Sequence, residues 1–362
     1  MKRVFLSLIC AMCAVASVFA QDAQKAAAEA AKAIVDAPEV VPEVEAPKYW
    51  TNSLMTNVNV GQTSLSNWAA GGDNTVSFAG FVDGNANYAK NEMFWNNRLQ
   101  LDYGFLYASS KPILQKSNDR IYLESKWGYK TENMKNFYFS ANYDFKSQFT
   151  TGYDYNTPAS LVDANGNDLE GDALKQAWKD ARALKSGFLA PAYTNLALGI
   201  DYKPTSWLSV NFAPLTGGYV IVRDESLRQS YSMELKKEYE GKDEASIPTD
   251  GSQYKGARFE FGAQLKVDAG VNVNDNFKYS TQVVLFYNYL AGQKCPRINW
   301  DNRIDWKLAK YFSLTLTTNL IYDDTIMITN PKDIDQYPGG KARVQFKESL
   351  AFGFTYTIAS KK

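Results

Sequence analysis

From Trp50 to the C-terminus, hydrophobic and polar residues alternate with a period of two, which is the pattern of half-buried β-strands. In the run 297–309, Ile298, Trp300 and Ile304 share one face, whereas Asp301 and Arg303 share the other. Many such segments exceed the roughly 9–11 residues that a tilted strand needs to cross a bilayer, and strands of soluble proteins are shorter. We count about twelve of them, at 53–62, 74–89, 93–109, 119–131, 136–153, 192–203, 206–214, 256–273, 277–290, 297–309, 311–323 and 342–358.

The connections between these segments alternate between short and long. The short ones are 90–92, 131–136, 203–206, 274–276 and Lys310; the long ones are 110–118, 154–191, 215–255 and 324–341, with 291–296 of intermediate length. Outer-membrane barrels have short periplasmic turns and longer extracellular loops. The pattern therefore predicts a single closed antiparallel transmembrane β-barrel over residues 49–362. An even number of strands would place both termini on the periplasmic side.

Aromatic residues gather near the short turns, as expected of rings at a membrane interface. The chain has 23 Tyr, 20 Phe and 8 Trp, although its mean hydropathy is only −0.37. The interface candidates are Trp50, Trp95, Trp207, Tyr311 and Phe312. Phe354 or Tyr356 would have to close the last strand as its aromatic anchor, because the chain ends in TYTIASKK.

Glu348 departs from the pattern, because it falls on the apolar face of the last predicted strand. A carboxylate facing lipid is costly in mid-membrane. We therefore expect a bulge at this point, or a depth near the outer interface.

Two segments precede the predicted barrel. Residues 1–20 combine a basic start, a short apolar run and small residues before Gln21, which is the pattern of a secretory signal peptide. Residues 21–48 are first Ala-rich and then Pro-rich. We interpret them as a periplasmic arm with a short helix, and a docked coiled-coil helix is the alternative.

The composition excludes several kinds of chemistry. The chain contains no His, so Ser-His-Asp and Cys-His catalysis and His-based metal sites are excluded. Lys and Arg together number 39, as do Asp and Glu, so no charge excess points to nucleic acid. We expect no cofactor. A membrane-embedded hydrolase built on Glu260, Asp301 and Asp305 is a disfavoured alternative.

The polar face of the strands would line the lumen of the barrel. Its charged candidates are Arg98, Asp102, Glu124, Lys126, Asp144, Lys146, Glu260, Lys266, Asp268, Asp301, Arg303, Asp305 and Lys307. Because both signs are interleaved, cross-strand ion pairs should fill part of the interior. The leading hypothesis is a narrow pore or transporter for small polar solutes. The alternative is a structural or assembly barrel that binds an unidentified protein through its loops or N-terminal arm; outer-membrane lipid and the barrel-assembly machinery would be partners in either case.

The long loops carry weaker signals. Asp163, Asn165 and Asn167 have the alternating oxygen spacing of a calcium loop, but Asp168 stands where that loop needs Gly. A solvated turn is therefore the simpler interpretation, and no metal site is assigned. Helical spacing over 174–184 predicts a short amphipathic helix capping the barrel mouth, or one that binds a partner. The charged segment 215–255 is either a surface loop or a constriction folded into the lumen.

Three stretches together carry a family resemblance: NWAAGGDNTVSFAG (67–80), WNNRLQLDYG (95–104) and SGFLAPAYTNLALGIDYKPTSWLSVNFAPLTGGYV (186–220). They resemble the uncharacterised outer-membrane β-barrel family known as domain of unknown function 3078, from Bacteroidetes-type Gram-negative bacteria. The resemblance extends from about Trp50 to the C-terminus. It implies an outer-membrane barrel, and it brings no established activity or catalytic residues. The Gly-rich part of the first stretch is followed by a strand pattern, so we interpret it as an outward-facing turn.

Overall fold

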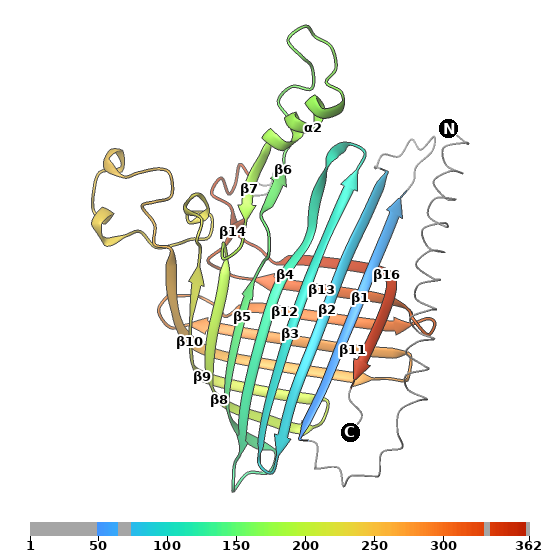
Figure 1. Ribbon diagram of the computed structural model, residues 1–362. Helices are drawn as coiled ribbons and strands as arrows, with labels where there is room; N and C mark the ends of the chain where they lie inside the picture. Colours follow the sequence, from blue (N-terminus) through green and yellow to red (C-terminus); the bar gives the residue numbers. More distant parts are fainter. Residues whose placement is uncertain (1–48, 64–73, 329–333, 360–362) are drawn as a thin grey trace, which may run out of the picture. The chain divides into compact units, whose positions relative to one another are not determined.

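The computed structural model describes residues 49–63, 74–328 and 334–359, and within them twelve antiparallel strands close into a barrel (Figure 1). Each strand pairs with its neighbours along the chain, and the last pairs with the first. The predicted closed barrel and its strand number are therefore confirmed. The barrel strands are β1 (Trp50–Thr63), β2 (Thr75–Lys90), β3 (Met93–Ala108), β4 (Lys111–Lys130), β5 (Phe137–Ser147), β8 (Ala192–Thr205), β9 (Leu208–Ile221), β10 (Ala257–Asn272), β11 (Phe277–Asn288), β12 (Arg297–Lys307), β13 (Phe312–Tyr322) and β16 (Gln345–Ala359).

The alternation of the sequence becomes an apolar outside and a polar inside. On β10, for example, Phe259 is 48% exposed on the outer surface, whereas the adjacent Glu260 is 4% exposed in the interior. A period-two strand reverses its side chains at every residue, so one face of each strand forms the outer wall of the barrel and the other faces the lumen. Among the described residues no helix is both long and apolar enough to cross a membrane.

Several strand boundaries differ from the sequence prediction. The predicted strand 136–153 ends at Ser147, and residues 152–155 belong to β6 outside the barrel. The expected loop 110–118 is mostly strand, because β3 and β4 form one long hairpin that turns at Ser109 and Ser110. The predicted strand 206–214 continues to Ile221 through Pro214 and two glycines, past a register shift against both neighbours. Gly218 suits the close pairing here, because an added Cβ would lie 2.1 Å from the carbonyl oxygen of Thr194.

The connection between β5 and β8 forms a folded extension of its own. It contains β6 (Gly152–Tyr155), paired with β7 (Arg182–Ser186), and the helix α2 (Gly171–Asp180). The predicted helix thus exists but ends earlier, and Leu184 belongs to β7. Its buried Trp178 packs against the end of the β3–β4 hairpin, with Lys111 Nζ 5.8 Å from the ring centroid. The helix therefore supports that hairpin and does not cap the lumen.

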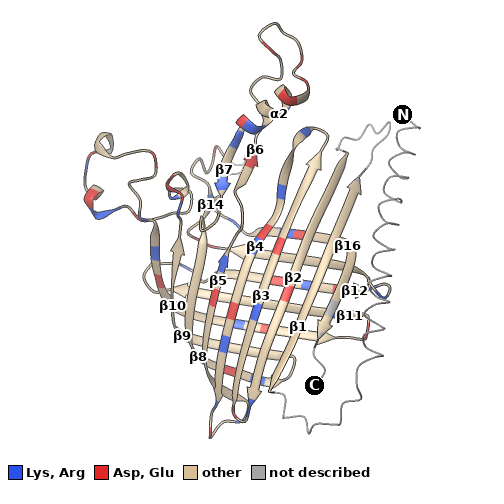
Figure 2. Cartoon of the chain, viewed as in Figure 1, with Lys and Arg blue, Asp and Glu red and all other residues tan. Residues whose placement is uncertain are grey.

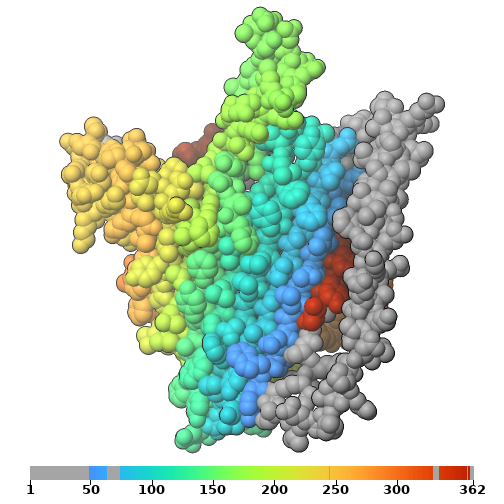
Figure 3. Space-filling model, viewed as in Figure 1, coloured from blue at the N-terminus to red at the C-terminus, as the bar shows by residue number. Residues whose placement is uncertain are grey.

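The connection between β9 and β10, residues 222–256, also folds outside the barrel (Figure 3). It contains three short 3-10 helices, η1 (Glu225–Leu227), η2 (Lys237–Tyr239) and η3 (Glu244–Ser246). A small apolar core of Ala190, Val220, Val222, Leu227 and Met233 anchors it to the ends of β8 and β9. The hypothesis that this segment forms a constriction in the lumen is therefore wrong for the residues that the structure describes. A third connection, between β13 and β16, carries the short pair β14 (Met327–Ile328) and β15 (Lys341–Ala342).

The barrel closes over a short seam. β1 and β16 form seven residue pairs, from Ser53 with Ala359 to Asn59 with Gly353. Beyond Asn59, β1 pairs with β2 alone, and the first part of β16 pairs with β13 alone. In Figure 1, β16 accordingly curves and lies beside β1 only along its final part.

Glu348 faces the outer surface, as its position in the pattern predicted. The β13–β16 register shows no shift around it, so the expected bulge is absent there. It is the fourth residue of β16, near the long-loop end, which agrees with the alternative expectation. Thr318 of β13 pairs with Glu348, and its hydroxyl accepts a hydrogen bond from Asn302 Nδ2 at 3.2 Å. The carboxylate thus lies at one end of a polar row on the outer wall.

Candidate functional site

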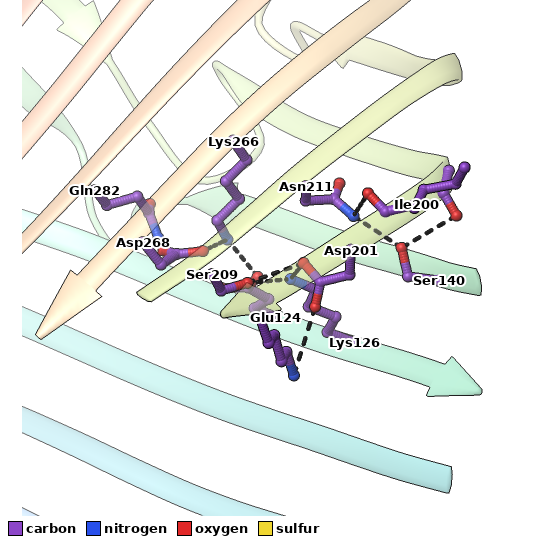
Figure 4. A network of polar contacts seen from close by, with 12 residues as sticks. Glu124, Lys126, Ser140, Ile200, Asp201, Ser209, Asn211, Lys266, Asp268 and Gln282 are labelled. Carbon is purple, nitrogen blue, oxygen red and sulfur yellow. Dashed lines mark hydrogen bonds and ion pairs between the residues drawn. The ribbon is translucent and has the colours of Figure 1, made fainter. Parts of the chain in front are cut away.

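An ion pair crosses the interior of the barrel and divides it. Lys266 of β10 bonds through Nζ to the Glu124 carboxylate of β4, although β5, β8 and β9 lie between these strands in the sheet (Figure 4). Lys266 Nζ also lies 3.8 Å from the carboxylate of Asp268, which in turn accepts a hydrogen bond of 2.7 Å from Gln282. We call this group of Glu124, Lys266, Asp268 and Gln282 the crossbar.

The side of the lumen enclosed by the crossbar is filled with polar side chains, and we call it the packed half. Asp201 is fully buried there, with Lys126 Nζ at 2.7 Å and the Ser209 hydroxyl donating to the same oxygen at 2.8 Å. Asn211, 1% exposed, donates to the Ser140 hydroxyl at 2.8 Å. Because buried polar groups need partners, these contacts join β4, β5, β8 and β9 inside the barrel and leave little room for solute.

The other side of the lumen holds a cavity of about 1120 Å³, and we call it the open half. Its wall comes mainly from β1 to β4, from β11 to β13 and from β16. It reaches Lys116 and Gln148 near the long-loop end, and Asn87, Asn96 and Thr205 near the short turns. Among the described residues, none from 154–191 or 215–255 lines it. The cavity therefore extends along most of the barrel without a described loop inside it.

The wall of the open half is hydrophilic, and most of its charges are paired. Arg98 contacts both oxygens of Asp83, at 3.0 and 2.6 Å, and Arg303 similarly contacts both oxygens of Asp305 at 2.8 Å. Charged residues accordingly recur at mid-height along the strands in Figure 2. Uncharged polar residues complete the wall: Asn57, Asn59, Asn85, Asn87, Asn97, Thr315, Thr317 and Asn319. Such a surface suits hydrated solutes.

The predicted lumen residues lie in both halves of the barrel interior. The cavity is lined by Arg98, Asp102, Glu124, Lys126, Lys146, Asp268, Asp301 and Arg303. Lys266 belongs to the crossbar, and Asp144 lies on its packed side, where Asn195 donates to it at 3.1 Å. Glu260 is bound by Arg258 and Arg297 at 3.1 and 2.9 Å, so it does not face the cavity. Asp305 binds Arg303 and does not line the cavity, and Lys307 is exposed at the end of β12.

Sequence reasoning missed several wall residues. Asp83, Arg120 and Lys203 line the cavity, as do the asparagines of β1 to β3. The period-two alternation could have identified them, because they occupy the positions that alternate with outward-facing residues such as Leu54 and Tyr88. The carboxylates considered for hydrolysis, Asp301, Asp305 and Glu260, each bond to a different neighbour, with Asn319 Nδ2 lying 2.6 Å from Asp301.

The weak calcium candidate forms a turn in the structure. The carboxylate of Asp163 accepts hydrogen bonds from the backbone N–H groups of Asn165 and Asn167, at 2.8 and 2.9 Å. The Asn167 side chain also donates to it at 3.2 Å. These bonds, chiefly those from Asn167, lower the pKa of Asp163. They account for the alternating oxygens as an Asx-type turn.

The five interface aromatics all lie at the short-turn end and are exposed. Trp50 stacks at an angle on Tyr88, with ring centroids 5.2 Å apart, and lies 6.0 Å from Trp95. Tyr311 contacts both Phe354 and Tyr356, the two anchors expected for the last strand. Phe312 continues this group, whereas Trp207 lies in the β8–β9 turn and also borders the cavity.

Comparisons with known structures return outer-membrane barrels at low similarity. The COG4313 outer membrane channel from Pseudomonas putida F1 is 10% identical, with 89% of this chain and all of that chain covered and a TM-score of 0.34. The translocator domain of the autotransporter NalP from Neisseria meningitidis is 9% identical, covering 94% and 97%, with a TM-score of 0.34. The P. putida toluene transporter TodX is 11% identical, covering 86% and 90%, with a TM-score of 0.28.

A search of curated proteins finds no match. The predicted signal peptide (1–20), the predicted arm (21–48) and most of the Gly-rich turn lie outside the described residues. A match to a family does exist, over residues 60–153. It includes the first two stretches that carried the resemblance and not the third, so it is narrower than the sequence suggested. Over residues 60–153, therefore, this barrel resembles the family described as "Protein of unknown function (DUF3078)".

Proposed function

We propose that this chain is a narrow outer-membrane pore for small polar solutes. The observation that carries the proposal is the open half of the lumen, a hydrophilic cavity that extends from the long-loop end to the short turns. Eight-stranded barrels are filled by their own side chains, and barrels of 16–18 strands leave a wide channel. A barrel of twelve strands with one side packed lies between these cases.

The orientation follows from the two kinds of connection. We place the short turns, with Trp50 and the end of β16, in the periplasm, and the folded extensions outside the cell, as in other outer-membrane barrels. The apolar outer wall then contacts membrane lipid, and the aromatic residues lie at the periplasmic interface. Insertion of such a barrel would require the barrel-assembly machinery.

A flux measurement tests the proposal. Liposomes containing the folded protein are expected to admit a monosaccharide faster than a trisaccharide, because the open half is narrow and hydrophilic. Solute entry would be followed by osmotic swelling, and folding would be verified by the electrophoretic shift between heated and unheated samples. Liposomes with heat-denatured protein serve as the control. Swelling no faster than this control, from protein shown to be folded, would contradict the pore.

A second candidate is a structural or assembly barrel that binds a protein partner outside the membrane. The observation that favours it is that the long connections are folded: Tyr231 of the 222–256 segment donates to Lys185 O at 3.0 Å, joining two extensions. Burial raises the pKa of Tyr231 to about 12. Membrane pull-downs with and without residues 21–48, and with and without the α2 extension, would discriminate between the candidates. Identical co-purifying proteins in all samples would count against this second role.

A further inference from the structure

Most carboxylates that line the open half are neutralised by a cation. Asp83 pairs with Arg98 at 2.6 Å and Asp119 with Lys116 at 2.9 Å, and the crossbar carboxylates share Lys266. Within the described part of the chain, Asp102 and Asp301 are the cavity-lining carboxylates that make no ion pair. The acidic residues therefore contribute less free charge to the cavity than their number suggests.

Three cations of the cavity wall lie toward its long-loop side and make no ion pair with a described residue; we call Arg120, Lys146 and Lys347 the basic cluster. Arg120 and Lys146 lie within electrostatic range of each other, and Arg297, Asp144 and Asp301 also act on Lys146. Lys347 Nζ donates to Asn118 Oδ1 at 2.8 Å.

Asp102 connects the members of the cluster. The Asp102 carboxylate lies within electrostatic range of Arg120, Lys347 and Arg303. The cluster thus joins strands β4, β5 and β16 around the cavity, where three cations face the carboxylates of Asp102 and Asp301.

Arg120 has unused capacity for a ligand. One of its terminal nitrogens bonds to the Gln100 side chain, whereas its Nε is buried and has no hydrogen-bond partner among the described residues. A guanidinium carries five donors in a planar fork that matches carboxylate and phosphate oxygens. Nε is shielded from the cavity, so the terminal N–H groups of Arg120 are the donors that an anion in the cavity would meet.

We propose that the basic cluster binds small anions of the carboxylate or phosphate type and gives the pore a preference for anions over cations. The inference rests on the proposed pore function and names its solute class. Rings of Arg and Lys have this effect in anion and phosphate pores. The composition of the lumen does not reveal this anion preference, because a count of charged residues treats paired and unpaired charges equally.

Reversal potentials across planar bilayers in a potassium chloride gradient test the inference. Wild type is expected to show the sign of a chloride-preferring pore. The triple variant Arg120→Gln/Lys146→Gln/Lys347→Gln should lose that preference, and Lys347→Gln alone should reduce it, with little risk to folding because Lys347 is exposed. The matched control Lys135→Gln/Lys307→Gln/Lys310→Gln removes the same charge outside the cavity and should behave as wild type.

Inorganic phosphate supplies a second readout. Added phosphate should reduce the chloride current of wild type and control, and should have less effect on the triple variant. A conducting wild type that prefers potassium, or equal phosphate effects in all three proteins, would overturn the anion site while leaving the pore intact. Folded protein with no conductance would instead remove the proposed function and the inference with it.

Discussion

Replacement of Lys266 by methionine is expected to destabilise the barrel by about 3–5 kcal/mol, the usual cost of removing one partner from a buried ion pair. Lys266 is 3% exposed and holds both Glu124 and Asp268, so its loss leaves two carboxylates in the interior without their cation. The measurement is denaturant unfolding in detergent micelles, followed by the electrophoretic shift of the folded barrel. Methionine keeps most of the side-chain volume, so packing alone should change little.

Two further variants separate the ion pair from general damage. Adding Glu124→Gln to Lys266→Met should recover part of the lost stability, because one orphaned charge is removed. Lys307→Met, on an exposed residue at the end of β12, should change stability by less than about 0.5 kcal/mol. If Lys266→Met unfolded at the wild-type denaturant concentration, the crossbar would not stabilise the barrel.

The second large effect is expected on the outer wall. Leu198 lies at the middle of β8 and is 44% exposed on the face assigned to lipid. Leu198→Arg should destabilise the barrel by about 2–4 kcal/mol when it is unfolded from lipid bilayers, because a guanidinium at mid-membrane is poorly solvated. Unfolding in liposomes with denaturant measures this cost.

An arginine introduced on the lumen side provides the comparison. Thr317 lines the open half, where an arginine side chain can remain hydrated, so Thr317→Arg should be nearly neutral for stability. Equal losses for the two variants would show that the assignment of the lipid-facing and lumen-facing sides is wrong.

The sequence predicted the architecture well because period-two alternation is a local signal. On β12, Trp300 and Asp301 face opposite sides as the pattern requires, and the short turns recur at the predicted places. The errors occurred where other signals overrode the alternation. The predicted strand 206–214 ended at Pro214, but β9 continues past it through a register shift. Gln115 and Lys116 fell within the predicted connection 110–118, but they pair with β3.

The arrangement of the lumen could not be predicted in the same way. Glu124 and Lys266 are 142 residues apart, and alternation shows that both point inward without showing that they meet. The division into a packed and an open half depends on which strands face each other across the barrel. The basic cluster likewise follows from pairing. Arg120 and Arg98 are equivalent in sequence pattern, but among the residues that the structure describes Arg98 pairs with a carboxylate and Arg120 does not.

The claim that solutes pass through the open half is tested most directly by blocking it from within. In a Cys295→Ser background, Thr317→Cys would place a thiol on the cavity wall, and Thr216→Cys would place one in the packed half, where Thr216 is fully buried. Planar-bilayer current would be recorded before and after a charged, water-soluble thiol reagent is added. We predict that the current falls for Thr317→Cys and is unchanged for Thr216→Cys. Unchanged current in Thr317→Cys together with block in Thr216→Cys, or no current from either folded protein, would contradict the account.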